Sequence, residues 1–200
     1  MTTTPNPLRL EFAQGRTLTI TGPADITRQQ ADAIVNAANS SLMGGGGVDG
    51  AIHAAGGPEI LEHCKQIVAR QGRLPEGQAV ATPGGRLPAR YVIHTVGPVW
   101  HGGHHGEPES LASCHRESIR VADELQLASI AFPAISTGIF GYPVELAAPV
   151  ALGSALNALR NAASVREVRF VLFDAKTHEH FAKAAEKLRV FSVEGKAPDV

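Results

Sequence analysis

Four consecutive glycines stand one residue before an acid, in a pattern suited to binding a phosphorylated ligand and orienting water beside it. The run is Gly44, Gly45, Gly46 and Gly47, and Asp49 follows after Val48. Glycine supplies no side chain and loses conformational entropy on folding, so four together indicate backbone that lies close to a ligand. Exposed N–H groups at a helix start bind anions with the help of the helix dipole. We therefore expect this loop to bind phosphate, most simply a diphosphate.

A second loop of the same character lies at residues 136–142, with the sequence STGIFGY, again between a predicted strand and a predicted helix. If the two preceding strands are neighbours, one diphosphate could lie between both loops. Phe140 and Tyr142 would then give apolar or stacking surface to the sugars on either side. The alternative is two strand-to-helix turns whose glycines only permit tight geometry. For either loop alone both interpretations fit equally well, and the pair favours the ligand.

Asp49 and His53 are four residues apart, so both side chains project from one helix face near the predicted phosphates. A carboxylate there could orient or activate water, and His53 could tune it. A first-turn aspartate can also serve only to stabilise the helix through its dipole. A single helical histidine is more often a buried residue with satisfied hydrogen bonds. The functional interpretation is favoured for Asp49 and is weaker for His53.

Two asparagines, Asn36 and Asn39, stand at the end of a predicted strand, where a buried amide needs hydrogen-bond partners. Asn39 is nearer the glycines and is a candidate for binding ribose hydroxyls. The alternative is an asparagine that caps or turns its own loop. That alternative is as good for Asn36, and less favoured for Asn39.

Other motifs carry less weight. Gly45, Gly47 and Gly50 match G-x-G-x-x-G, but the acid expected about 20 residues later is replaced by Arg70, which argues against a dinucleotide fold. His101, His104 and His105 lack a fourth ligand or a helical i, i+4 pair, so they predict a mobile, exposed lid and not a zinc site. The two cysteines, Cys64 and Cys114, fall on apolar helix faces and are expected in the core.

The elements that position these loops alternate in type. Helical spacing of apolar residues predicts helices from about 48, from Pro58, and over about 111–127, 144–160 and 177–189. This alternation predicts one three-layer α/β domain with a mostly parallel sheet and a core over about 8–189, between short tails of which the C-terminal one is frayed. It also places Phe173 at the end of a core strand. Short apolar segments predict strands at 8–13, 17–21, 33–36, 78–82, 90–96, 129–133 and 167–173.

The amino-acid composition argues against several classes of protein. The 200 residues include 18 basic and 19 acidic side chains, a formal charge of −1, which disfavours a bulk electrostatic nucleic-acid binder. Two cysteines without C-x-x-C spacing indicate a reducing compartment. The chain shows neither a signal-peptide pattern nor an apolar run of membrane-spanning length, so we expect a cytoplasmic protein.

These residues together resemble the macrodomain family, specifically its MacroD-type branch of ADP-ribosyl hydrolases. The resemblance spans about residues 8–189 as one domain within 1–200, and its motifs occur in the family's order. They are ADIT at 24–27, DAIVNAAN at 32–39, GGGGVDGAIH at 44–53, RYVIHTVGP at 90–98 and PAISTGIFGYP at 133–143.

The resemblance implies a three-layer α/β/α sandwich with a mixed, mostly parallel sheet and a cleft for ADP-ribose. Asp25 would bond the adenine amino group beside Ile26, and Phe173 would stack on the adenine. Asn39 would hold the distal ribose, while Asp49 would position or activate the attacking water. His53, from its position one helical turn after Asp49, is the third candidate of this catalytic group. The diphosphate and distal ribose would be wrapped by Gly44, Gly45, Gly46, Gly47 and Val48 and by Ser136, Thr137, Gly138, Ile139, Phe140, Gly141 and Tyr142.

The reaction implied is removal of mono-ADP-ribose from acidic protein side chains and, by the same ester chemistry, deacetylation of O-acetyl-ADP-ribose. The resemblance implies no metal or redox cofactor and no membrane partner. The partners would be ADP-ribose, its esters and mono-ADP-ribosylated proteins, with nucleic acid entering only as an ADP-ribosylated end. The competing hypothesis is a module that reads ADP-ribose without turning it over. A third, an NAD-dependent oxidoreductase, predicts hydride transfer that we do not expect.

Overall fold

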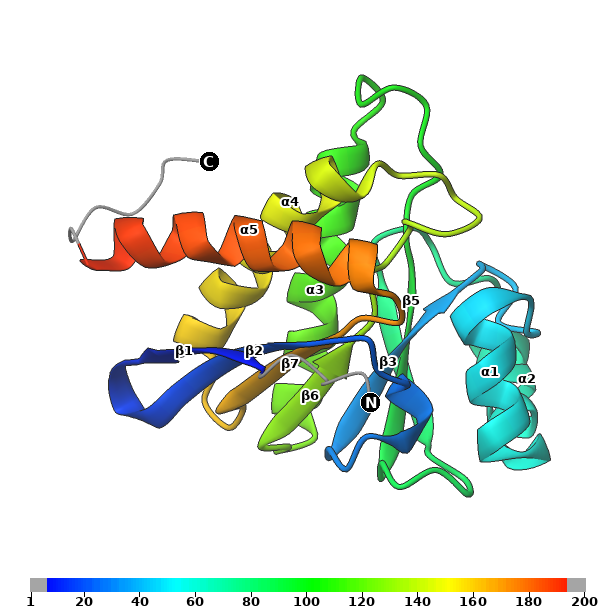
Figure 1. Cartoon of the computed structure of the whole chain (residues 1–200). Coiled ribbons are helices and arrows are strands. Elements are labelled where there is room, and N and C mark those ends of the chain that lie inside the picture. Colours follow the sequence, from blue (N-terminus) through cyan, green and yellow to red (C-terminus); the bar gives the residue numbers. More distant parts are fainter. Residues whose placement is uncertain (1–6, 194–200) are drawn as a thin grey trace, which may run out of the picture.

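The computed structural model describes residues 7–193, and side chains up to residue 188. Seven strands form one sheet that lies between two layers of helices (Figure 1). The termini, including most of the predicted C-terminal tail, lie outside the described residues. The strands are β1 (Leu8–Phe12), β2 (Arg16–Thr21), β3 (Ala33–Ala38), β4 (Ala79–Pro83), β5 (Tyr91–Val96), β6 (Ser129–Phe132) and β7 (Glu167–Val171). The α-helices are α1 (Gly47–Gly56), α2 (Pro58–Gln71), α3 (Glu107–Glu124), α4 (Val144–Asn161) and α5 (Ala175–Val193).

The sheet order is β1-β2-β7-β6-β3-β5-β4. Its five inner strands pair in parallel, and the two edge strands, β1 and β4, pair antiparallel with their neighbours. The mixed, mostly parallel three-layer fold is therefore confirmed. No helix in the described part of the chain is long and apolar enough to cross a membrane.

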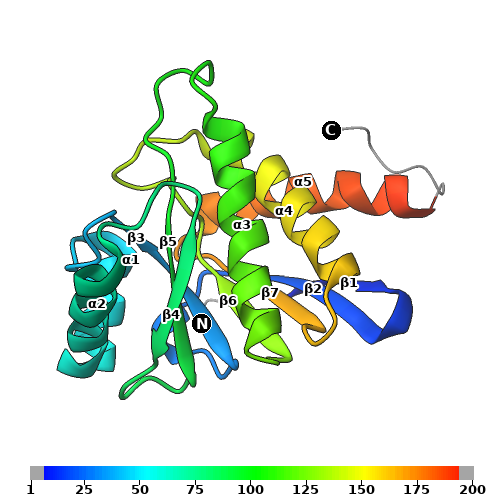
Figure 2. The same ribbon diagram turned by 180° about the vertical axis from the view of Figure 1, so that it is seen from behind.

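Alternation along the inner strands divides the core between the two faces of the sheet. Val35 and Ile93 belong to the apolar cluster under α3, α4 and α5. Ile34 and Val92 belong to a second cluster with Ile52 of α1 and Ile60 of α2. Figure 2 shows these two helices together on one side and α3 and α4 on the other. Because side chains alternate with period two, any residue two positions beyond Ile34 or Val92 also faces α1 and α2.

The predicted strands and helices are confirmed within a few residues at their ends. α3 begins at Glu107, earlier than its apolar pattern suggests, with a proline in its first turn. β7 ends at Val171, so Phe173 lies beyond the strand. Its placement in the core is wrong, because 84% of its surface is exposed. Two short 3₁₀ turns, Ala13–Gly15 and Ile26–Arg28, were not predicted.

Candidate active site

The predicted site residues lie along one edge of the sheet. β2, β7, β6 and β3 are consecutive and parallel, so their carboxyl ends meet at the same edge. Open α/β sheets bind ligands outside this edge. The segments that leave these four strands carry, in the order of the strands, Asp25 with Ile26, then Phe173, residues 136–142 and the glycine run.

The two glycine loops face one another, because β3 and β6 are parallel neighbours. A Cβ atom on Gly46 would lie 3.4 Å from Cδ1 of Ile139, so the second loop reaches over the first. Gly44 and Gly47 have φ angles of +87° and +60°, a region that favours glycine. The strands before the two loops are thus neighbours, which is the arrangement that one ligand lying between both loops requires.

Both loops present unpaired backbone donors. α1 begins after Gly46 with no side-chain cap, so its first N–H groups point outward without intrahelical partners. In the second loop, the described residues provide no hydrogen-bond acceptor for the N–H groups of Gly138, Ile139 and Phe140. One set of free donors at the start of α1 and a second set in the loop that faces it suit an anion such as a diphosphate.

The residues that the resemblance predicts around the adenine lie where β2 and β7 end. The N–H of Ala24 donates to the carbonyl of Leu172 at 2.9 Å, which joins the two segments. Asp25 accepts bonds from the Thr27 hydroxyl at 2.7 Å and the Thr27 N–H at 2.9 Å. The hydroxyl bond is the main cause that lowers the pKa of Asp25, so its carboxylate is charged at neutral pH. The exposed ring of Phe173 and this acceptor suit a flat, hydrogen-bonding base.

Asp49 is almost fully buried, with 4% of its surface exposed, and its two oxygens differ in environment. Oδ1 accepts from Nδ2 of Asn36 at 2.7 Å. Nε2 of His53 lies 3.3 Å from the same oxygen, but the contact lacks hydrogen-bond geometry and leaves this nitrogen unpartnered. Oδ2 faces the glycine loop, since a Cβ on Gly45 would lie 3.1 Å from it. One oxygen is fixed, and the other is turned toward the predicted ligand.

The side chain of Asn39 turns its own loop, the alternative that the sequence disfavoured. Its Oδ1 accepts from the N–H of Ser41 at 3.0 Å, and its Nδ2 donates to the carbonyl of Gly44 at 2.9 Å. One N–H of Nδ2 remains for a ligand. Binding of the distal ribose by Asn39 stays a prediction.

Three residues of the second loop divide into buried and exposed members. The ring of Tyr142 is buried and packs on Trp100, with ring centroids 4.4 Å apart. Its predicted place beside a sugar is therefore wrong, and only its backbone belongs to the loop. Ser136 is also buried and has a φ of 65°. Ile139 is 84% exposed and lies beside Gly46 of the first loop.

The histidine loop is exposed as predicted, but its backbone is fixed. The buried carboxylate of Glu107 accepts from the N–H groups of His101 at 2.9 Å, Gly103 at 3.1 Å and His105 at 2.7 Å. Next to this loop, the N–H of Trp100 donates to the carbonyl of Phe140 at 2.9 Å. Glu107 thus anchors the backbone of the histidine loop, and Trp100 beside it contacts the second glycine loop, neither of which the predicted mobile lid anticipates.

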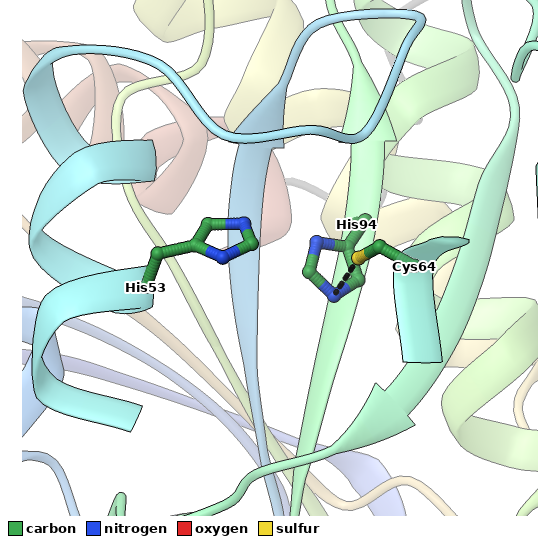
Figure 3. A group of neighbouring side chains, drawn as sticks. All are labelled: His53, Cys64 and His94. Carbon is green, nitrogen blue, oxygen red and sulfur yellow. Dashed lines mark hydrogen bonds between the residues drawn. The ribbon is translucent and has the colours of Figure 1, made fainter. Parts of the chain in front are cut away.

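The sequence reasoning missed His94, a buried polar side chain behind Asp49. His94 is the register partner of Asn36 across β3 and β5, and both face α1 and α2. Figure 3 shows His53, Cys64 and His94 pointing toward one another, with one donor atom of each within 4.8 Å of the others. Imidazole and thiol groups are ligand types that zinc accepts. Strand parity was the available signal, because His94 follows Val92 by two residues as Asn36 follows Ile34.

Burial keeps His94 and Cys64 uncharged. Desolvation, with a smaller contribution from His53, lowers the pKa of His94 to about 3. Desolvation, with the charge of Asp49 adding to it, raises the pKa of Cys64 to about 11. At neutral pH the imidazole and the thiol are therefore both neutral.

Comparison with known proteins agrees with this geometry. The Macro domain family model matches residues 35–151. A Macro domain-containing protein of Caldanaerobacter subterraneus is 56% identical over 82% of this chain and 93% of its own length. A Salmonella typhimurium protein named O-acetyl-ADP-ribose deacetylase is 52% identical over 88% of this chain and 93% of its own.

Solved structures agree as well. The Oceanobacillus iheyensis macrodomain with ADP superposes with a TM-score of 0.87 at 38% identity, over 92% of this chain and 97% of that one. The Trypanosoma brucei macrodomain in complex with ADP-ribose gives a TM-score of 0.76 at 37% identity, over 84% of this chain and 68% of that one.

Proposed function

The chain belongs to the macrodomain family, and on that basis we propose that it hydrolyses esters of ADP-ribose. The substrates would be O-acetyl-ADP-ribose and proteins that carry mono-ADP-ribose on an acidic side chain. In both, water cleaves an ester, releasing free ADP-ribose together with acetate or the protein carboxylate. The single observation that carries the proposal is Asp49, a buried acid with one oxygen fixed by Asn36 and the other turned toward the glycine loop.

The two glycine loops support binding of the diphosphate, because they face one another and present unpaired N–H groups. Asp25 and Phe173 support binding of the adenine. A relative named O-acetyl-ADP-ribose deacetylase and related structures with ADP and ADP-ribose support this assignment of substrate.

Catalysis requires little beyond this arrangement. An ester at an anomeric carbon is already activated, so fixing the distal ribose and one water molecule supplies much of the rate through proximity. Asp49 would orient that water with Oδ2 and accept its proton as attack proceeds. A protein that only reads ADP-ribose needs the loops, Asp25 and Phe173, but it has no use for an acid at this position.

The test compares the parent chain with Asp49→Ala. Free ADP-ribose is measured after incubation with a protein mono-ADP-ribosylated on glutamate, acetate after incubation with O-acetyl-ADP-ribose, and affinity for ADP-ribose by calorimetry. We expect the variant to lose at least about a hundredfold in turnover and to keep its affinity within about tenfold. Glu124→Gln, at an exposed acid on α3, is the control and should match the parent.

Two results would contradict the proposal. Tight binding of ADP-ribose without release by the parent would make the chain a reader. Equal turnover by the parent and by Asp49→Ala would remove Asp49 from the chemistry.

A further inference from the structure

The hydrogen bonds behind Asp49 can be assigned a direction. Nδ2 of Asn36 lies 2.7 Å from Oδ1 of Asp49 and 3.0 Å from Nδ1 of His94. An amide nitrogen donates two N–H groups and accepts none, so both neighbours must accept. Nδ1 of His94 is therefore the unprotonated nitrogen of a neutral ring.

The other ring nitrogen of His94 extends this series of hydrogen bonds. A neutral imidazole with Nδ1 unprotonated carries its proton on Nε2, and this nitrogen lies 2.9 Å from Oγ1 of Thr82. The Thr82 hydroxyl donates to the carbonyl of Pro83 at 3.1 Å, which leaves its oxygen free to accept from His94. The chain runs from the backbone of edge strand β4 through Thr82, His94 and Asn36 to Asp49.

The opposite orientation of the Asn36 amide is excluded by charge. Turning it over would bring its Oδ1, an acceptor, to within 2.7 Å of the Asp49 carboxylate oxygen. In the observed orientation, Oδ1 of Asn36 is buried without a hydrogen-bond partner, so this oxygen does not decide how the amide is turned. Asp49 and His94, which accept its two N–H groups, therefore set the orientation of this amide.

We propose that His94 is a positioning residue for Asp49, acting through the Asn36 amide. This inference rests on the proposed function and adds to it the group that aims the acid. By accepting one N–H of Asn36, His94 directs the other N–H at Oδ1 of Asp49. With Oδ1 held, Oδ2 is turned toward the glycine loop and the reacting water. His53 cannot replace this support, because its contact with Oδ1 lacks hydrogen-bond geometry.

The same assignment argues against a zinc ion held by His53, Cys64 and His94. Of the ring nitrogens of His94, Nε2 is the one that faces Cys64, at 3.8 Å from Sγ (Figure 3). That nitrogen carries the proton directed at Thr82, so its lone pair is not available to a metal. Moving the proton to Nδ1 would set it against an N–H of Asn36. Sγ of Cys64, a weak acceptor, is therefore a second and more distant neighbour of that proton, and Thr82 at 2.9 Å is its main acceptor.

The test uses four variants of the full chain. His94→Leu removes both ring nitrogens, and His94→Asn restores an acceptor near the position of Nδ1. Thr82→Val removes the acceptor of the Nε2 proton with little change of shape. Cys64→Ala touches the same ring and is the matched control. Each is assayed for kcat with O-acetyl-ADP-ribose and for the Kd of ADP-ribose by calorimetry, and circular dichroism checks that it folds.

We expect kcat to fall at least about tenfold in His94→Leu and at least about threefold in Thr82→Val, with the Kd of ADP-ribose within about threefold of the parent. His94→Asn should return kcat to within about threefold of the parent, which a merely structural role would not do. Cys64→Ala should keep the parent kcat. In the parent, nitrogen-15 NMR of the His94 ring should show the proton on Nε2 at neutral pH.

Several results would overturn the inference. The first is a folded His94→Leu variant whose kcat equals that of the parent, and the second is a His94 ring that carries its proton on Nδ1. The others are a variant that loses as much affinity as kcat, and a Cys64→Ala variant that loses activity. If His94→Leu does not fold, parent kcat in Thr82→Val overturns it. If the parent releases no product at all, the proposed function fails and this inference fails with it. An active parent with an equally active His94→Leu refutes the positioning role alone.

Discussion

A fully buried histidine in α3 should make the protein lose stability in mild acid. The ring of His115 lies against Phe132 and Phe170, with ring centroids 5.0 and 5.8 Å away. Its Nδ1 donates to the carbonyl of Leu111 at 2.8 Å, and Nε2 is buried without a partner. Because burial penalises the charged ring, the pKa of His115 falls from 6.5 to about 4.

The sign and the size of the effect follow from proton linkage. As the pH falls below 6.5, the unfolded chain binds a proton at this histidine, and the folded chain does not until about pH 4. The unfolded state then binds more protons, so the free energy of unfolding decreases as the pH falls. Each pH unit in this window costs about 1.4 kcal/mol, so lowering the pH from 7 to 5 costs about 2 kcal/mol at this site.

The assay is urea unfolding of the parent and of His115→Leu, each at pH 7 and pH 5. The variant changes packing at both pH values, so only the difference between them is compared. We expect the loss between pH 7 and pH 5 to be smaller in the variant by about 2 kcal/mol. His94 titrates in both proteins and cancels. His104→Leu, on the exposed loop, is the control and should keep the parent's pH dependence. An equal loss in the parent and in His115→Leu would refute the reasoning.

Three further predictions concern the residues expected to contact the ligand and the carboxylate of Glu107 that holds the histidine loop. Phe173→Ala should weaken binding of ADP-ribose about tenfold by calorimetry, as expected for the loss of a stacked base, while the melting temperature is unchanged because the ring is 84% exposed; unchanged affinity would contradict its role. Gly45→Ala places a Cβ 3.1 Å from Oδ2 of Asp49, so kcat should fall about tenfold or more, measured by acetate release. Glu107→Ala removes the acceptor of three N–H groups, so limited proteolysis should cut residues 101–105 faster than in the parent; an equal rate would show that the carboxylate does not hold the loop.

The sequence alone was enough to predict the seven strands, the five α-helices and the two loops that face one another. Strands and helices can be predicted from the spacing of apolar residues along the chain, because this spacing shows which side chains share the buried face of an element. The glycine run and the 136–142 loop could be identified because glycine adds no side chain to the core, so packing does not explain why glycines gather there. Asp49 could be selected from its position in the first turn that follows the glycines.

Only the tertiary structure decided which of these residues meet and which way their side chains face. The pairing of Asn36 with His94 depends on the register of β3 and β5, which are joined by two helices and another strand. The exposure of Phe173 depends on where β7 ends, and the burial of Tyr142 depends on Trp100, 42 residues earlier. Contacts between segments distant in sequence are fixed by packing of the whole domain, and local patterns give at most the face of the sheet on which a side chain lies.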